Sequence, residues 1–391
     1  MTLADSNSPP PHLAGPPVYT NWIAANAGHP PLGVNEFPLF TDAHITGEVA
    51  VGPYEFINTV PIPRIGLIKA SVVLRVAGHV IWPSPDMTKT STDLYHGGSF
   101  PEELAALASL AMGIRLRAGN MTRSFEPGGD PKGKPTEWGI GRLTGNLIRE
   151  DHLRWRLPGA AEGQHSLEAI EVLRNLPLMT PQAASALVRA ARLYQDALWL
   201  IESEPSLAWL MLVSAVETAA SHWRRADGDP VDRLQSSRPD LYSYLSKIGP
   251  EVAAEVARYI ADSLGSTKKF VDFVMSFLPG PPPTRPPAPY QFDWQEAEIR
   301  RVLRKIYGCR SEALHDGKPF PEPMSESPFA DRGWAAPSER SIALATSSKG
   351  AVWLAKDAPM LFHLFEYIAR NALISWWQRG APDDDSAEVM G

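Results

Sequence analysis

Residues 293–317 read DWQEAEIRRVLRKIYGCRSEALHDG. The spacing of the apolar residues in this stretch is that of a single stripe on one α-helix. The Asp-Gly pair at 316–317 is typical of a helix end. The stretch therefore predicts a helix from Asp293 to His315. Its apolar stripe is formed by Ile299, Val302, Leu303, Ile306 and Ala313.

Helical signals continue on both sides of this stretch. Thr180 is a good N-cap residue with Pro181 at the first helical position, and Pro205 opens a second, largely apolar stretch. Residues 176–380 are therefore predicted to form an all-α helical bundle. Its further helices are expected over residues 230–247, 250–263, 268–278 and 356–378.

The preceding residues, 41–175, have a different pattern. Residues 45–51 alternate loosely and residues 67–82 are rich in β-branched side chains, so both predict strands. A capping box begins at Ser99, and the apolar helix that follows it ends at Gly113; a further strand is expected over 114–117. This region is predicted to be a mixed α/β domain of unknown role, which makes the whole chain α+β.

Four segments lack a folding pattern of their own. Residues 1–40 are rich in Pro and Gly and predict a loose arm, whereas the proline run at 279–290 favours polyproline II and reads as an insertion in the helical region. Residues 318–350 predict an irregular insertion. Residues 381–391, APDDDSAEVMG, predict an acidic tail.

Composition narrows the function classes. The net charge of -7 argues against a protein that coats nucleic acid, but it allows a local site for one phosphate. The single cysteine permits no disulfide within the chain and fits a reducing, intracellular setting. The most apolar stretch, residues 197–220, is interrupted by Glu202, Glu204 and Pro205, so it does not form a membrane span. We expect a cytoplasmic protein without a membrane span. The motifs of P-loop, dinucleotide, zinc-protease and serine-hydrolase sites are missing from the sequence, so no metal or cofactor is predicted.

Arg310 is the first residue that points to chemistry. It follows Ile306 by four residues and so continues the apolar stripe, although a guanidinium is rarely buried without a partner. It either pairs with a carboxylate in the core or faces an interface or cleft. His315 lies about 140° further around the helix, so the two side chains can converge only at the helix end; otherwise His315 caps that end. Glu217 lies on the apolar helix after Pro205 and needs a partner, for which Arg310 is the best candidate.

Two stretches together resemble one known family. The segment YGCRSEALHDG, residues 307–317, resembles the Arg-x(4–6)-His motif of the HEPN superfamily, in particular its Apea-like branch. The segment LAWLMLVSAVETA, residues 207–219, is similar to a family helix that carries a glutamate where Glu217 stands. The resemblance covers roughly residues 178–380. Matching positions in the first segment are Tyr307, Arg310, Ser311, Leu314, His315 and Gly317.

The resemblance implies a helical bundle that usually dimerises, with the Arg and His of two subunits facing a shared cleft. It also implies metal-independent RNA cleavage to a 2′,3′-cyclic phosphate and a 5′-hydroxyl. In that reading His315 is the general base, Arg310 clamps the phosphate, Glu217 orients Arg310 and Ser311 holds a phosphate oxygen. Such a ribonuclease could serve as a stress or anti-phage defence effector. The insertions at 279–290 and 318–350 depart from the compact family bundle.

Alternatives to catalysis remain open in the sequence. Tyr307 and Arg304 are further candidates for substrate binding, and Arg304 belongs to a basic patch that nearby carboxylates almost balance, so a salt-bridged face is the other interpretation. The chain could equally be a non-catalytic nucleic-acid-binding, sensing or protein-interaction module. There Arg310 and Glu217 would form a structural ion pair and His315 a helix cap.

Overall fold

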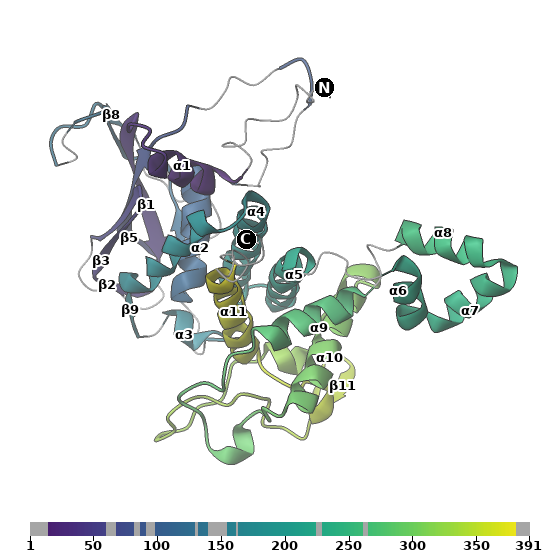
Figure 1. Cartoon of the computed structure of the whole chain (residues 1–391). Helices are drawn as coiled ribbons and strands as arrows, with labels where there is room; N and C mark the ends of the chain where they lie inside the picture. The colour runs from purple at the N-terminus through teal and green to yellow at the C-terminus, as the bar shows by residue number, and fades with distance from the viewer. Residues whose placement is uncertain are drawn as a thin grey trace, which may run out of the picture.

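A computed structural model describes residues 15–59, 68–81, 87–90, 98–129, 132–139, 155–161, 163–223, 229–260 and 265–380. Within these ranges a unit of sheet and helices is followed by a helical unit (Figure 1). This arrangement confirms the predicted α+β class. Residues 1–14 of the predicted arm and the predicted acidic tail lie outside the described residues.

The prediction of a loose arm over residues 1–40 is wrong from residue 15 onward. Helix α1 (Pro17–Asn26) buries Val18 and Trp22, and strand β1 (Gly33–Thr41) runs through the middle of the sheet. These segments show no obvious apolar period because polar residues occupy some of their buried positions, where tertiary partners bind them. Glu36 on β1, for example, is fully buried and ion-paired with Arg75 and Arg123.

The main sheet is antiparallel in all its described pairings. Its order is β3 (Glu48–Val51), β4 (Tyr54–Asn58), β5 (Lys69–Gly78), β1, β7 (Arg123–Phe125) and β8 (Glu137–Trp138), with β6 (Arg117–Ala118) also on β1. Strand β5 lies within the strand predicted over 67–82 and buries Val72, Leu74 and Val76. The strand expected over 114–117 is wrong except at Arg117, where β6 begins.

The strand expected over 45–51 is divided in two. Gly47 has a φ of 75°, and it separates β2 (His44–Thr46) from β3. Strand β2 leaves the main sheet and pairs in parallel with β9 (Gln164–Ser166). Short helix α3 (Pro158–Ala161) precedes β9.

Helix α2 (Phe100–Met112) joins the sheet to the helical unit. Its capping box at Ser99 and its left-handed C-cap at Gly113 are confirmed, and nearly every one of its side chains is buried. It contacts α4 (Pro181–Leu200), so one hydrophobic core runs through both units. The predicted boundary at 175/176 falls inside the 3₁₀ helix η2 (Leu167–Leu178), which packs into the same core.

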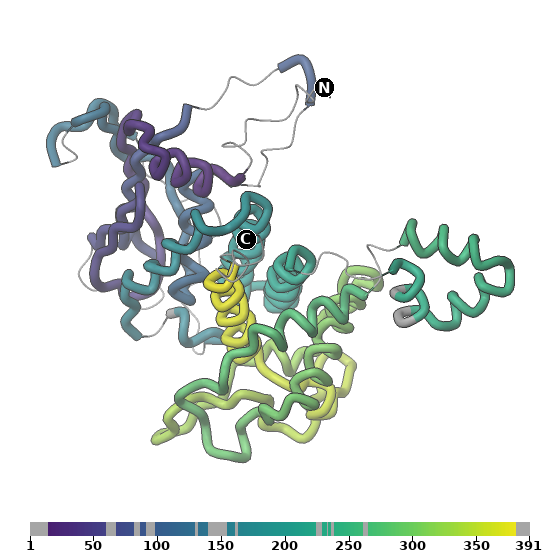
Figure 2. The backbone as a smooth tube through the Cα atoms, viewed as in Figure 1, coloured from purple at the N-terminus to yellow at the C-terminus, as the bar shows by residue number. Residues whose placement is uncertain are grey.

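The helical unit consists of α4, α5 (Pro205–Trp223), α9 (Ser266–Ser276), α10 (Glu296–His315) and α11 (Phe362–Arg379) (Figure 2). Thr180 caps α4 as predicted, accepting from the Ala183 amide. Helix α10 begins at Glu296 rather than Asp293, because the Asp293 carboxylate accepts from the Gln295 amide in a turn before it. The last helix begins at 362 rather than 356, after the 3₁₀ helix η5 (Ala355–Asp357).

A small helical lobe projects from the helical unit between α5 and α9. We call residues 229–260 the α6–α8 lobe; its helices are α6 (Pro230–Ser237), α7 (Pro239–Ile248) and α8 (Pro250–Ile260) (Figures 1 and 2). It has a separate apolar cluster, formed around Leu234, Leu245, Ala253 and Ala257. The lobe is therefore held together by its own contacts.

The two predicted insertions pack on each other and on the bundle. They contain 3₁₀ helices η3 (Ala288–Tyr290) and η4 (Glu322–Ser325), and a hairpin of β10 (Ala345–Ser348) and β11 (Ala351–Leu354) follows. Arg285 in the proline run binds Glu339 through two nitrogens, at 2.6 and 2.8 Å. Phe320 stacks on the fully buried Trp209 of α5. None of the helices in the described ranges could cross a membrane on the criteria of length and apolarity.

Candidate functional site

Glu217 connects α5 to α10 through two hydrogen bonds. One of its carboxylate oxygens accepts from the Tyr307 hydroxyl at 2.6 Å, and the other accepts from Nη2 of Arg310. The contact between Glu217 and Arg310 that the sequence predicts is therefore confirmed. The guanidinium of Arg310 is thus the oppositely charged partner that stabilises the Glu217 carboxylate on its largely apolar helix.

The three residues of this network are largely shielded from solvent. The Arg310 and Glu217 side chains retain 18% and 21% exposure. Burial, and then the hydrogen bond to Glu217, raises the pKa of Tyr307 to about 12, so its hydroxyl keeps the proton that it donates. The Arg310 guanidinium also lies over the Tyr307 ring, 5.5 Å from its centroid. The network therefore fixes the orientation of Arg310.

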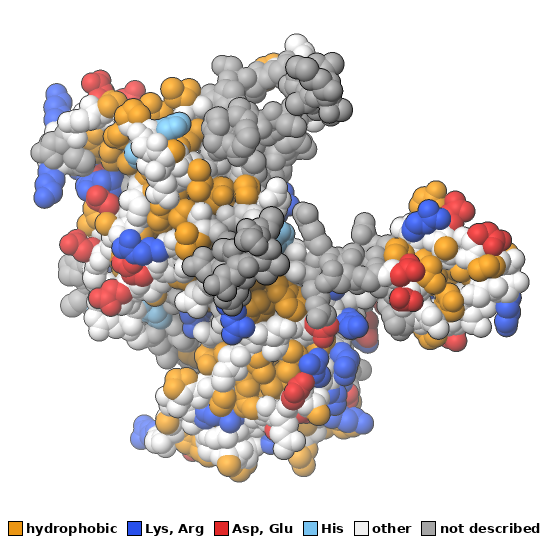
Figure 3. Space-filling model, viewed as in Figure 1, with side chains coloured by type: hydrophobic (Ala, Val, Ile, Leu, Met, Phe, Trp, Pro, Cys, Tyr) orange, Lys and Arg blue, Asp and Glu red, His pale blue; other side chains and the backbone are white. Residues whose placement is uncertain are grey.

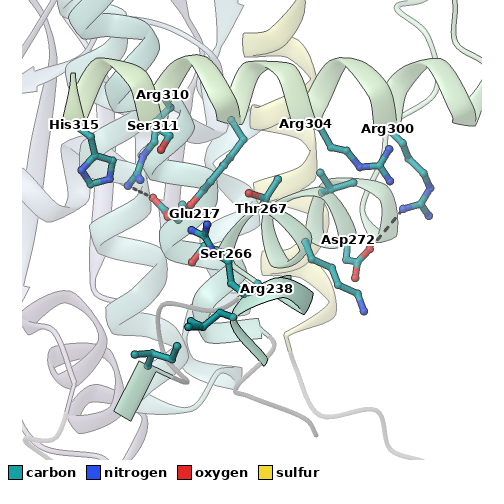
Figure 4. Close-up of a pocket in the computed structure, with 16 residues that line it drawn as sticks. Glu217, Arg238, Ser266, Thr267, Asp272, Arg300, Arg304, Arg310, Ser311 and His315 are labelled. Carbon is teal, nitrogen blue, oxygen red and sulfur yellow. Dashed lines mark hydrogen bonds and ion pairs between the residues drawn. The ribbon is translucent and has the colours of Figure 1, made fainter. Parts of the chain in front are cut away.

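The network lies in the wall of a cavity of about 1330 Å³. This volume exceeds the roughly 300–1,000 Å³ of pockets that hold small molecules. All six residues that the sequence selects line the cavity. They are Glu217, Arg304, Tyr307, Arg310, Ser311 and His315. Figure 4 labels five of them, four spread along α10 and Glu217 on the helix below it.

The helical period explains how residues of α10 share this cavity. Arg304, Ser311 and His315 follow one another at intervals of seven and four residues and so fall on one stripe of the helix. Arg310 lies on the neighbouring face and reaches Glu217 from there (Figure 4). Arg310 and His315 thus approach the same hollow although their positions on the helix are about 140° apart.

His315 occupies the last turn of α10 and is exposed. Among the described contacts its ring has no hydrogen-bond partner, whereas the backbone NH of Asp316 closes the helix by donating to the Glu312 carbonyl. Its imidazole can therefore exchange protons with a ligand in the cavity. The Nε of Arg310 is buried without a hydrogen-bond partner in the described ranges, but its Nη1 keeps donors beyond the Nη2 that binds Glu217, and these can bind an anion.

Several cavity residues were not selected from the sequence. Ser266, Thr267 and Lys268 come from the first turn of α9, and Arg238 comes from the junction of α6 and α7 (Figure 4). The run Gly-Ser-Thr-Lys at 265–268 was the available signal, since small hydroxyl residues before a lysine suit anion binding. Only the tertiary fold places these residues opposite α10.

The basic patch of α10 divides into paired and unpaired cations. Arg300 pairs with Glu296 at 2.8 Å and with Asp272 at 3.5 Å, Arg301 pairs with Glu298, and Lys305 pairs with Asp357. The predicted salt-bridged face is therefore confirmed for these three. Arg304 has no carboxylate partner among the described residues. Figure 3 shows Lys and Arg side chains gathered on the helical unit near α10.

Within the described ranges, no group of three or more His, Cys, Asp or Glu side chains comes together as a metal site would require. Comparison with known proteins adds no assignment: no family model, curated protein or solved structure matches this chain.

Proposed function

We propose that the chain is a metal-independent endoribonuclease of the HEPN type, with Arg310 and His315 as its reacting pair. One observation carries this proposal. A largely buried ion pair holds Arg310 in the wall of a cavity that His315 also lines, at the end of the helix that bears the family-like motif. An oriented guanidinium beside an accessible imidazole suits the cleavage of a phosphodiester.

In this mechanism the neutral His315 imidazole takes the proton of a ribose 2′-hydroxyl. The 2′-oxygen then attacks the adjacent phosphorus, a new P–O2′ bond forms and the P–O5′ bond breaks. The leaving 5′-oxygen takes a proton from water in the open cavity, and the hydroxide that remains takes the proton held by His315, which restores the neutral imidazole. The products are a 2′,3′-cyclic phosphate and a 5′-hydroxyl.

The remaining residues hold Arg310 or the phosphate. The Arg310 guanidinium binds the non-bridging oxygens and stabilises the charge that develops on them. Glu217 and Tyr307 act as positioning residues because Glu217 holds Arg310 and Tyr307 holds Glu217. Ser311, on the His315 stripe, is placed to donate to a phosphate oxygen. A homodimer and a defence role belong to the same proposal through the family resemblance.

The test is cleavage of a labelled RNA in the presence of EDTA. We expect wild-type protein to yield fragments with cyclic phosphate ends, and His315→Ala to lose at least about a hundredfold in rate, as for loss of a general base. His29→Ala is the matched control, because His29 is exposed and lies outside the cavity. Undiminished cleavage by His315→Ala would refute the mechanism.

A second candidate is a non-catalytic binding module, which the ion pair itself favours. The Glu217–Arg310 contact joins α5 to α10 and is mostly buried, so it also has a structural role. In a pure binding module Arg310→Ala lowers the melting temperature and no RNA is cleaved by any variant. A folded Arg310→Ala protein that binds RNA but has lost wild-type cleavage would exclude this candidate.

A further inference from the structure

Three cations that line the cavity have no carboxylate partner among the residues that the structure describes. They are Arg304 on α10, Lys268 on α9 and Arg238 on the α6–α8 lobe, and all three are exposed. No ion pair involving them occurs among the described residues, whereas most other cations of α10 are paired. Cations that line a hollow and have no carboxylate partner in the described ranges attract anions from solution, because no described counter-charge offsets their field.

The three cations extend the site away from Arg310. Arg304 precedes Arg310 by six residues on α10, which corresponds to about 9 Å along the helix axis. A stacked nucleic-acid strand rises about 3.4 Å per nucleotide, so this separation spans roughly two to three nucleotides. Cations at this spacing fit different phosphates of one strand rather than a single phosphate.

The cations also come from different walls. Lys268 belongs to α9, in the helical unit. Arg304 belongs to α10, in the same unit, while Arg238 belongs to the lobe (Figure 4). The lobe thus forms one side of the hollow and the bundle the other. A strand in the hollow would be contacted from both sides.

We propose that Arg238, Lys268 and Arg304 form a track for the backbone of single-stranded RNA, which leads several nucleotides of substrate past the Arg310–His315 pair. The proposal rests on the proposed function for the identity of the strand. The α6–α8 lobe then contributes to substrate binding through Arg238. Positively charged grooves that follow the phosphate backbone are the usual means of binding single strands without sequence preference.

Two observations favour a single strand over a duplex. A duplex is usually read over many base pairs by contacts across its outer surface, whereas these cations line the two sides of one hollow. Attack of a 2′-hydroxyl in line with the P–O5′ bond also needs a backbone that can leave the A-form geometry. Unpaired nucleotides have that freedom.

The test measures binding separately from cleavage. The full chain carrying His315→Ala is titrated into fluorescein-labelled hexauridylate, into a uridine dinucleotide and into a duplex RNA, and anisotropy is followed at several salt concentrations. We expect the hexamer to bind at least about tenfold more tightly than the dinucleotide or the duplex, since it reaches more of the track.

Removing the track provides the decisive comparison. Each phosphate contact of a single strand contributes about 0.7 to the slope of log K against log salt. In the triple variant Arg238→Gln, Lys268→Gln, Arg304→Gln, the slope of log K against log salt should therefore be smaller in magnitude by about 2. The variant should also lose roughly a hundredfold in affinity at about 0.1 M salt. All three residues are exposed, so its circular dichroism should match the parent.

A second triple variant controls for net charge. Arg301→Gln, Lys305→Gln, Lys349→Gln removes the same charge from residues that are paired outside the cavity with Glu298, Asp357 and Glu322. Equal losses of affinity in the two triple variants, unchanged binding by the first, or equal affinity for duplex and hexamer would each overturn the track. The expected binding pattern without cleavage by the wild type would support the track and refute only the catalytic proposal.

Discussion

The ion pair between Glu217 and Arg310 offers the sharpest test of how this site is built. We consider a double-mutant cycle of Glu217→Gln, Arg310→Gln and the combined variant. Removing one partner of a fully buried pair costs about 3–5 kcal/mol, because the other charge is left without compensation. The exposure of 18% and 21% of the two side chains places each single substitution near the lower end, at about 2–3 kcal/mol.

These costs translate into measurable changes of the melting temperature. An unfolding entropy of about 2.1 cal/mol/K per residue gives about 0.8 kcal/mol/K for 391 residues, so each single variant should melt about 3 °C lower. The combined variant leaves no charge unpaired and should melt well above the sum of the two losses. The expected coupling energy is about 1.5–3 kcal/mol, measured by calorimetry and urea unfolding.

A matched cycle on the same helix supplies the control. Glu298 and Arg301 form an exposed pair three residues apart, for which a coupling of only about 0.3–0.5 kcal/mol is expected. If the Glu217 and Arg310 costs add within about 0.5 kcal/mol, their side chains are not coupled. The account of Arg310 as an oriented group would then fail.

Three further predictions concern the framework around the site. Trp209→Ala removes a fully buried ring that stacks on Phe320. It should lower the free energy of unfolding by about 3–5 kcal/mol and make residues 318–350 more sensitive to protease. A melting temperature within about 1 °C of wild type, which corresponds to a loss of only about 1 kcal/mol, would contradict this packing. Burial raises the pKa of Glu103 from 4.5 to about 8. Between these two pH values the folded protein retains a proton that the unfolded chain has released, so the stability of the wild type falls as the pH rises from 4.5 to about 8. Glu103→Gln should remove this fall, and parallel curves of melting temperature against pH for the two proteins would disprove it. Gly113→Ala places a side chain at a φ of 71° with its Cβ 3.0 Å from Arg370, so it should lower the free energy of unfolding by more than the roughly 1 kcal/mol expected from the backbone alone. The control is Gly128→Ala, whose Cβ, at a φ of 75°, meets no neighbour within 4 Å. Equal losses of stability in the two variants would show that the Arg370 contact is unimportant.

The helices of the C-terminal half were predictable because their signals are local. Thr180 and Pro181 mark the start of α4, and the apolar stripe of α10 follows the helical period. The N-terminal arm was mispredicted for the opposite reason. Strand β1 carries Glu36 into the sheet interior, and only Arg75 and Arg123, distant in sequence, make that burial possible.

The candidate site divides in the same way. Arg310 and Glu217 could be predicted as site residues because a charge on an apolar helical stripe departs from the local pattern. Their mutual contact followed from the requirement that buried charges be paired. Lys268 and Arg238 could not be found like this, because a charged residue at a helix start or in a short connection violates no pattern.

The sequence by itself determined the main helices of the C-terminal half, the caps of several of them, and that the charges of Arg310 and Glu217 need partners inside the bundle. These follow from the period of apolar side chains, from capping residues and from the cost of an unpaired buried charge. Only the tertiary structure decided that α9 and the α6–α8 lobe face α10 across one hollow. That arrangement depends on packing between segments far apart in the chain, which no local pattern encodes.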